Sequence, residues 1–170
     1  ALLVAAAKFG LDMAVVRANF SGQVTKQFDS VQKMMSTFGV NDGSLLFKQG
    51  ISVKFVKGAP LETLRCCRYL RMRNDIVEIS NADRERIIAA NDRLASEGHR
   101  VLALAYVEGN TASEAEEYDL IFVGLAAMMD PPRPEVFEAV ALCQQAGICV
   151  TMITGDYGLT GEAVGRQIGL

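Results

Sequence analysis

The stretch VKFVKGAPLETLRCC, residues 53–67, changes from a strand pattern to a helix pattern within a few residues. Its first part alternates apolar and polar side chains as in a half-buried strand, and Pro60 suits the first turn of a helix. Lys57 and Gly58 therefore lie at a strand-to-helix corner. Glycine lets another group approach the backbone closely, and lysine offers a mobile positive charge to an anion. The corner suits a phosphate-bearing ligand; the alternative is a tight turn with a solvated lysine.

The composition is that of a globular chain with mixed charge. Half of the 170 residues are hydrophobic, which is enough for one domain with a core or for one domain and part of another. The net charge is −3, and no basic stripe with interleaved aromatic residues occurs, so nucleic acid is not expected as a partner. The longest apolar run, residues 120–129, is much shorter than the roughly 18 residues that a membrane-spanning helix needs.

The cysteines and the single histidine form no pattern that indicates a metal site. The cysteines show no metal-ligand spacing; they are Cys66, Cys67, Cys143 and Cys149. We expect them to be buried or idle thiols in a reducing cytosol. His99 is expected to be a packing or surface residue rather than a ligand or a base.

The sequence up to residue 129 predicts an α+β domain with an antiparallel sheet flanked by helices. It starts inside an apolar helix pattern at 2–9 with no capping residue, which predicts a piece cut from a longer chain. Alternating runs between residues 24 and 56, with the turn signal NDGS at 41–44, predict an antiparallel meander. Two helices are expected next, one at about 60–70 and one from the capping box of Ser80 and Asp83 to Gly98. Two strands are then expected at 100–107 and 119–129, with an acidic loop at 108–118 between them.

After residue 129 the pattern changes to that of a parallel α/β unit. The proline-rich DPPRPEV, residues 130–136, predicts a stiff joint. A helix at 136–145, a buried strand at 148–153, a TGD corner and a helix from Leu159 are expected to follow. We therefore predict a boundary at Asp130, with one domain over 1–129 and a hinge with a fragment of a second domain over 130–170.

Four short stretches together resemble one protein family. They are FDSVQKMMS at 28–36, VKGAP at 56–60, DPPR at 130–133 and MITGD at 152–156. In this order and at these separations they resemble the cytosolic nucleotide-binding domain of P-type cation-transporting ATPases, running on into the phosphorylation domain. The resemblance covers essentially the whole chain. It implies a nucleotide-binding domain truncated at its N-terminus, followed by part of a haloacid-dehalogenase-like α/β unit.

The resemblance implies an ATP pocket and assigns residues to it. The implied lining residues are Phe28, Lys33, Met35, Lys57, Gly58 and Arg100. An aromatic face such as that of Phe28 can stack on adenine, and the two lysines can meet the purine pocket or the phosphates. Gly58 would clear space for the nucleotide. For Met35 the alternative is a core position, and for Arg100 a solvated position at the start of a strand.

The resemblance also implies a phosphoryl site and a hinge. Thr154, Gly155 and Asp156 follow an apolar strand, where a hydroxyl and backbone amides can face an anion. Thr154 would then hydrogen-bond the transferred phosphoryl group; the alternative is a plain strand-to-helix turn. Asp130 and Arg133 would form the hinge between the two domains, where prolines limit backbone freedom and so define the closing motion.

Some positions depart from the family pattern. Leu61 intrudes before Glu62, Gln32 replaces an arginine and Gly161 replaces an alanine. The sequence contains neither D-K-T-G-T, which carries the family's phosphorylated aspartate, nor G-D-G-x-N-D, which helps to hold magnesium. The implied chemistry therefore depends on residues that lie outside this sequence.

The resemblance implies a cytoplasmic segment of a multi-pass membrane cation pump. It would position ATP for phosphoryl transfer to an aspartate outside this chain, with ATP and ADP as ligands and Mg²⁺ acting in the full pump. Its partners would be the remaining phosphorylation, actuator and transmembrane domains, and residues 134–170 could mediate dimerisation. The alternatives are a phosphatase fragment of the haloacid dehalogenase type, which would need an absent aspartate-x-aspartate motif, and a non-catalytic interaction module. A Rossmann oxidoreductase is excluded because no G-x-G-x-x-G follows a strand.

Overall fold

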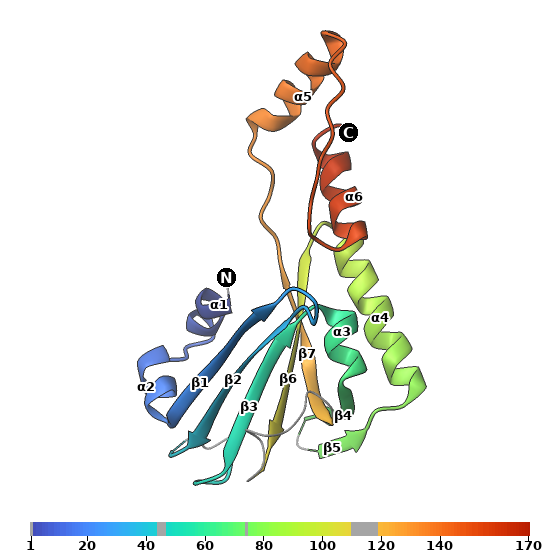
Figure 1. Cartoon of the computed structure of the whole chain (residues 1–170). Helices are drawn as coiled ribbons and strands as arrows, with labels where there is room; N and C mark the ends of the chain where they lie inside the picture. Colours follow the sequence, from blue (N-terminus) through green and yellow to red (C-terminus); the bar gives the residue numbers. More distant parts are fainter. Residues whose placement is uncertain (1, 44–46, 74, 110–118) are drawn as a thin grey trace. The chain divides into compact units, whose positions relative to one another are not determined.

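The computed structural model describes residues 2–43, 47–73, 75–109 and 119–170 (Figure 1). These residues form two compact units. The first, which we call the sheet unit, comprises Ala1–Glu85 and Leu102–Ala126, and the second, the helical unit, comprises Arg86–Val101 and Ala127–Leu170. Within the described residues, no helix has both the length and the apolar character needed to cross a bilayer. The boundary at Asp130 stays a prediction.

The sheet unit is built on seven strands in the order β1-β2-β3-β6-β7-β4-β5. Their bounds are β1 Phe20–Asp29, β2 Met34–Asn41, β3 Ser52–Gly58, β4 Cys67–Met72, β5 Asp75–Glu78, β6 Arg100–Glu108 and β7 Leu120–Met128. Strands β1, β2 and β3 form the predicted antiparallel meander, and β6 pairs antiparallel with β3. Strand β4, however, pairs parallel with β7. The sheet is therefore mixed rather than purely antiparallel, as Figure 1 shows.

The predicted corner between strand and helix is confirmed, but its helix is short. Helix α3 spans Pro60–Arg65, with Cys66 as its C-cap, whereas the sequence predicted a helix to about residue 70. The residues after Cys66 form β4 instead, which pairs with β5 on one side and with β7 on the other. Pairing on both sides outweighs the local helix preference of this segment.

The remaining helices of the first part follow local capping signals. Helix α1 spans Leu2–Lys8, and α2 spans Met13–Ala18. Helix α4, Asn81–Ser96, begins with the predicted capping box, in which Asp83 N–H donates to Ser80 Oγ and Ser80 N–H donates to an Asp83 carboxylate oxygen. Gly98, at φ 85°, follows its end.

The helical unit contains α5, Glu135–Gln145, and α6, Gly158–Gln167, near their predicted positions. The predicted buried strand at 148–153 is wrong, because these residues form neither strand nor helix, and Ile153 is 93% exposed. A strand requires a neighbour for its backbone groups, and the described residues of this unit supply none. The parallel α/β part of the predicted fold is therefore not shown. The predicted acidic loop lies almost entirely outside the described residues, as does the end of the NDGS turn.

Candidate functional site

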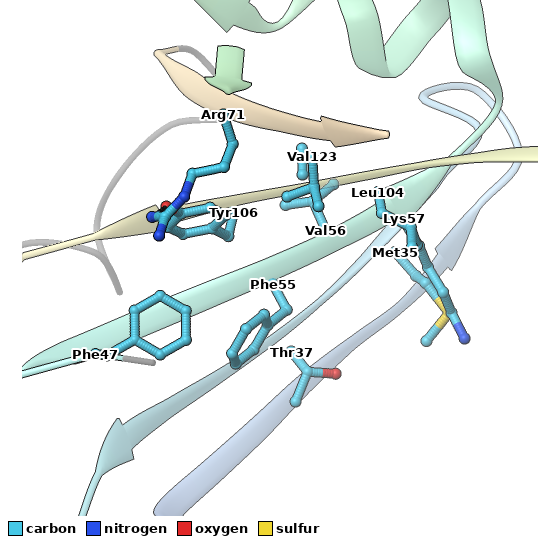
Figure 2. A pocket seen from close by; sticks show the side chains of 11 residues that line it. Met35, Thr37, Phe47, Phe55, Val56, Lys57, Arg71, Leu104, Tyr106 and Val123 are labelled. Atoms are coloured by element: carbon cyan, nitrogen blue, oxygen red, sulfur yellow. Dashed lines mark hydrogen bonds between the residues drawn. The ribbon is translucent and has the colours of Figure 1, made fainter. Parts of the chain in front are cut away.

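A cavity of about 500 Å³ lies on one face of the sheet unit. Strand register explains its floor, because residues that pair across neighbouring antiparallel strands project from the same face. Lys57 pairs with Met35 on one side and with Leu104 on the other. The adjacent row consists of Thr37, Phe55 and Tyr106. Two rows of three side chains from β2, β3 and β6 thus form the floor (Figure 2).

One end of the cavity is aromatic. Phe47, in the segment between β2 and β3, contacts Phe55 and Tyr106 edge to face, with ring centroids 5.8 and 5.4 Å apart. Arg71 of β4 reaches toward this end, as Figure 2 shows, and its Nη1 donates to the Tyr106 hydroxyl at 2.9 Å. The Tyr106 side chain is buried, so the hydrogen bond satisfies a polar atom that burial would otherwise leave costly.

The cavity combines an apolar lining with two positive charges. Among the described lining residues, Lys57 and Arg71 are charged, and Figure 2 shows Arg71 beside Tyr106 at the aromatic end and Lys57 beside Met35 at the other end. An apolar cavity with a few placed polar groups is the usual form of a small-molecule site. This arrangement can hold a flat aromatic ring against side chains of the sheet and an anion beside lysine.

The turn between β1 and β2 packs tightly against the corner at Gly58. Lys33 has the left-handed φ of 52°, and its carbonyl accepts a hydrogen bond from Ala59 N–H at 2.9 Å. A Cβ on Gly58 would lie 2.5 Å from Met34 Cγ and 2.6 Å from the Lys33 carbonyl oxygen. The space beside Gly58 is thus filled by protein atoms. Contact of Gly58 with a nucleotide stays a prediction.

The Lys33 ammonium has a carboxylate partner. Lys33 Nζ lies 2.8 Å from Glu62 Oε1 in α3. Burial alone would raise the pKa of Glu62, but hydrogen bonding and the charge of Lys33 outweigh burial and hold that pKa below its ordinary value. Glu62 is therefore a charged carboxylate at neutral pH.

Phe28 lies near the end of β1 and is 59% exposed. The following Asp29 accepts hydrogen bonds from the backbone N–H groups of Val31 and Gln32 at 2.7 and 3.1 Å, which shapes the turn. Of the predicted nucleotide set, Met35 and Lys57 are among the described residues that line the cavity, and Phe28 and Lys33 are not. The structure therefore brings only part of that set together in one cavity.

The predicted phosphoryl residues lie in the helical unit together with Arg100. Asp156 N–H donates to Thr154 Oγ1 at 3.1 Å, and both carboxylate oxygens of Asp156 accept from Arg100. The hydrogen bond and charge of Asp156 raise the pKa of Arg100. The predicted hinge residues, Asp130 and Arg133, are exposed. The described residues contain no group of three or more histidine, cysteine, aspartate or glutamate side chains that could hold a metal ion.

Arg71 and Tyr106 are cavity residues that the sequence did not single out. Tyr106 could have been found from the alternation in RVLALAYV, which places it on the same face as Leu104. Arg71 follows a segment that the sequence predicts as helix, so no sequence pattern indicated that Arg71 lies on a strand beside the cavity.

The fold is that of an α+β domain built on a mixed sheet, with a cavity on one face. Residues 1–135 match the model of the family described as P-type ATPase, cytoplasmic domain N. The chain belongs to this family.

Relatives extend the similarity along the whole chain. Calcium-transporting ATPase 1 of Lactococcus lactis is 37% identical over 147 residues, covering 84% of this chain and 16% of the relative. The calcium-transporting ATPase of Bacillus subtilis is 35% identical over 174 residues, covering 100% of this chain and 19% of the relative. The cation-transporting ATPase pma1 of Synechocystis is 33% identical over 175 residues, covering 100% of this chain and 18% of the relative. The chain spans less than a fifth of the length of these curated relatives.

Proposed function

We propose that this chain binds ATP and positions it for phosphoryl transfer within a P-type cation pump. The observation that carries the proposal is the row formed by Met35, Lys57 and Leu104, which places a lysine beside an apolar cavity. Membership of the nucleotide-binding family supports this use of the cavity. The acceptor would be an aspartate that this sequence does not contain, and transfer to it would couple ATP hydrolysis to cation transport.

The proposed pump is a multi-pass membrane protein with this segment on its cytoplasmic side. The names of two relatives, calcium-transporting ATPases from Lactococcus lactis and Bacillus subtilis, favour calcium as the cation. The remaining phosphorylation, actuator and transmembrane domains would be its partners. Thr154, Gly155 and Asp156 would serve at the phosphoryl site, and Asp130 and Arg133 at the hinge.

Nucleotide titration of the 170-residue chain tests the proposal. Lys57→Ala should weaken ATP binding without lowering the melting temperature, because a cavity-lining lysine contributes little to the core. The matched control is Lys54→Ala, which removes the same charge from the opposite face of β3. Full ATP affinity in Lys57→Ala would show that the cavity is not part of the nucleotide site.

Adenosine separates the contribution of the base from that of the phosphates. Phe28→Ala should weaken adenosine and ATP alike, by about 1–3 kcal/mol if the ring stacks on adenine. Lys57→Ala should weaken ATP more than adenosine if the ammonium contacts a phosphate, and added salt should reduce that difference. Phe9→Ala removes another exposed ring and should change neither affinity.

Magnesium should change the affinity of this chain for ATP only slightly. The G-D-G-x-N-D motif that helps to hold magnesium in the family is absent from the sequence. A strong magnesium requirement for binding would contradict this assignment of the site.

A further inference from the structure

Phe47 lines the aromatic end of the cavity and packs against three other rings. Its ring centroid lies 6.3 Å from that of Phe20, 5.8 Å from that of Phe55 and 5.4 Å from that of Tyr106, each edge to face. Phe55 and Tyr106 form the row next to Lys57, and Figure 2 shows Phe47 beyond this row, at the end of the cavity away from Lys57. Because edge-to-face contacts favour one arrangement of the rings, the Phe47 side chain has a defined position.

The backbone that carries Phe47 is held by a buried asparagine. Asn41, at the end of β2, is fully buried, and its Nδ2 donates to the carbonyl oxygens of Phe47 and Lys48 at 2.8 and 3.1 Å. Its backbone N–H donates to the Ile51 carbonyl, and its own carbonyl accepts from Gly50 N–H. Breaking these bonds would leave buried polar groups without partners, which is costly. Phe47 is therefore a fixed wall of the cavity.

The chemistry of adenosine decides which edge of the base faces this wall. With the phosphates beside Lys57, the ribose follows them, and the base extends along the floor toward the aromatic end. The row of Phe55 and Tyr106 lies two residues, or about 7 Å, further along the strands than Lys57. In adenosine the ribose is attached at N9, so the edge with the 6-amino group lies farthest from the ribose. This 6-amino edge is the part of the base that meets Phe47.

We propose that Phe47 is a specificity-determining residue of the nucleotide site, an inference that rests on the proposed function. Its ring is the wall at which the 6-amino edge of adenine ends, and it excludes nucleotides that carry a larger group on that edge. Because Asn41 holds the segment, the wall does not yield to a larger base. Phe47 thereby limits the size of the base that the cavity accepts.

Changing the size of the wall tests this role in the 170-residue chain, with adenosine and N6-benzyladenosine as the titrated probes. The wild-type chain should bind N6-benzyladenosine more weakly than adenosine. In Phe47→Ala the benzyl group can fill the vacated space, so the Kd for N6-benzyladenosine should fall at least about ten-fold, the range of one buried aromatic group. The Kd for adenosine should rise about two- to ten-fold, because one aromatic contact is lost. In Phe47→Trp the larger ring should weaken the binding of both probes.

Two controls show where the larger probe binds. Phe9→Ala removes an exposed ring that is not among the described lining residues, and it should change neither Kd. ATP should displace N6-benzyladenosine from Phe47→Ala, because both occupy the same cavity. Melting temperatures show whether each variant is folded. If Phe47→Ala does not fold, Phe47→Leu, which keeps an apolar side chain without the ring, takes its place and should change both affinities in the same directions.

The outcomes distinguish this inference from the proposed function. If Lys57→Ala weakens ATP binding but Phe47→Ala leaves the ratio of the two Kd values unchanged, the inference is overturned and the proposed function stands. N6-benzyladenosine that ATP does not displace, or an equal gain in Phe9→Ala, also overturns the inference. If the wild-type chain binds neither adenosine nor ATP, the proposed function is wrong and the inference falls with it.

Discussion

Arg100 and Asp156 form a two-pronged ion pair, in which Nε donates to Oδ1 at 2.8 Å and Nη2 donates to Oδ2 at 2.9 Å. The first residue was predicted for the nucleotide and the second for the phosphoryl site. In the helical unit the two side chains are partners, and both assignments stay predictions. The geometry is the favourable fork-to-fork arrangement of guanidinium and carboxylate.

This ion pair should contribute only modestly to stability, because the Arg100 side chain is mostly exposed. Asp156→Asn should lower the free energy of unfolding by about 0.2–1 kcal/mol, and the loss should shrink in high salt. Urea unfolding of both single variants and of the double variant with Arg100→Gln measures the coupling. A salt-independent loss well above this range would show that the pair is a structural element of the unit.

Arg84 should be more important than its place on a charged helix suggests. Its Nη1 donates to the Leu64 carbonyl at 2.7 Å, and its Nη2 donates to the Cys67 carbonyl at 2.6 Å. These two carbonyls lie at the junction between α3 and β4. Arg84→Ala should lower the free energy of unfolding by about 2–3 kcal/mol, because two acceptors lose a charged donor. Arg84→Lys, which cannot serve both carbonyls in the same way, should lose an intermediate amount. Equal stability of all three proteins would contradict this role.

Cys67 should be unreactive in the folded chain. Burial and, to a smaller extent, the neighbouring Cys66 raise the pKa of its thiol to about 12, and Arg84 offsets only part of the increase. Since the thiolate is the nucleophile, iodoacetamide at about pH 8 should modify the exposed Cys149 and spare Cys67 until the chain unfolds. Peptide mass spectrometry with and without urea measures this. Equal labelling rates for both cysteines in the folded chain would refute the prediction.

Stability should fall on acidification through Asp29 and Glu62. Hydrogen bonds from the backbone of Gln32 and then Val31 lower the pKa of Asp29, and Lys33 lowers that of Glu62 against the opposing effect of burial. Both carboxylates bind protons less readily in the folded chain than in the unfolded chain. Their contribution is therefore complete above the ordinary values of 3.8 and 4.5 and is lost as the pH falls through the lower folded-state values.

The measurement is the free energy of unfolding as a function of pH in the wild-type chain and in the double variant Asp29→Asn, Glu62→Gln. The double variant should show a weaker loss of stability below about pH 4. Identical pH dependence would mean that other groups account for the loss.

Residues 134–170 should promote self-association. Large apolar side chains are exposed there, among them Phe137, Leu142, Ile148 and Ile153. Ile153→Lys should therefore reduce any concentration-dependent dimer seen by light scattering, whereas Val31→Lys, at an equally exposed apolar position in the sheet unit, should not. A monomer at all concentrations, with a uniformly protected tail in hydrogen exchange, would contradict the prediction.

Local signals in the sequence predicted the elements whose stabilising contacts are also local. The capping box at Ser80 and Asp83 located the start of α4, and alternation located the meander, since register between neighbouring strands follows from side-chain pattern. The corner at Lys57 and Gly58 followed from a strand pattern that meets a proline.

Elements that depend on distant partners were not predictable in this way. Residues 67–70 read as helix but belong to the strand Cys67–Met72, because the partners of this strand come from Asp75–Glu78 and Leu120–Met128. Residues 148–153 read as a buried strand but have no pairing partner among the described residues. In the same way the partners of Lys33 and Arg100, namely Glu62 and Asp156, had no signal in sequence spacing.

The pairing of β3 with β6 has a consequence for how the chain folds as it is synthesised. Strands β1 to β3 are neighbours in sequence and can associate early, but β6 reaches β3 only after α3, β4, β5 and α4 have been made. Until then β3 is an open edge that could recruit strands from other chains. It carries Lys54 and Lys57, and charged lysines on an edge discourage such pairing. The corner lysine would thus protect the nascent chain before any nucleotide is bound.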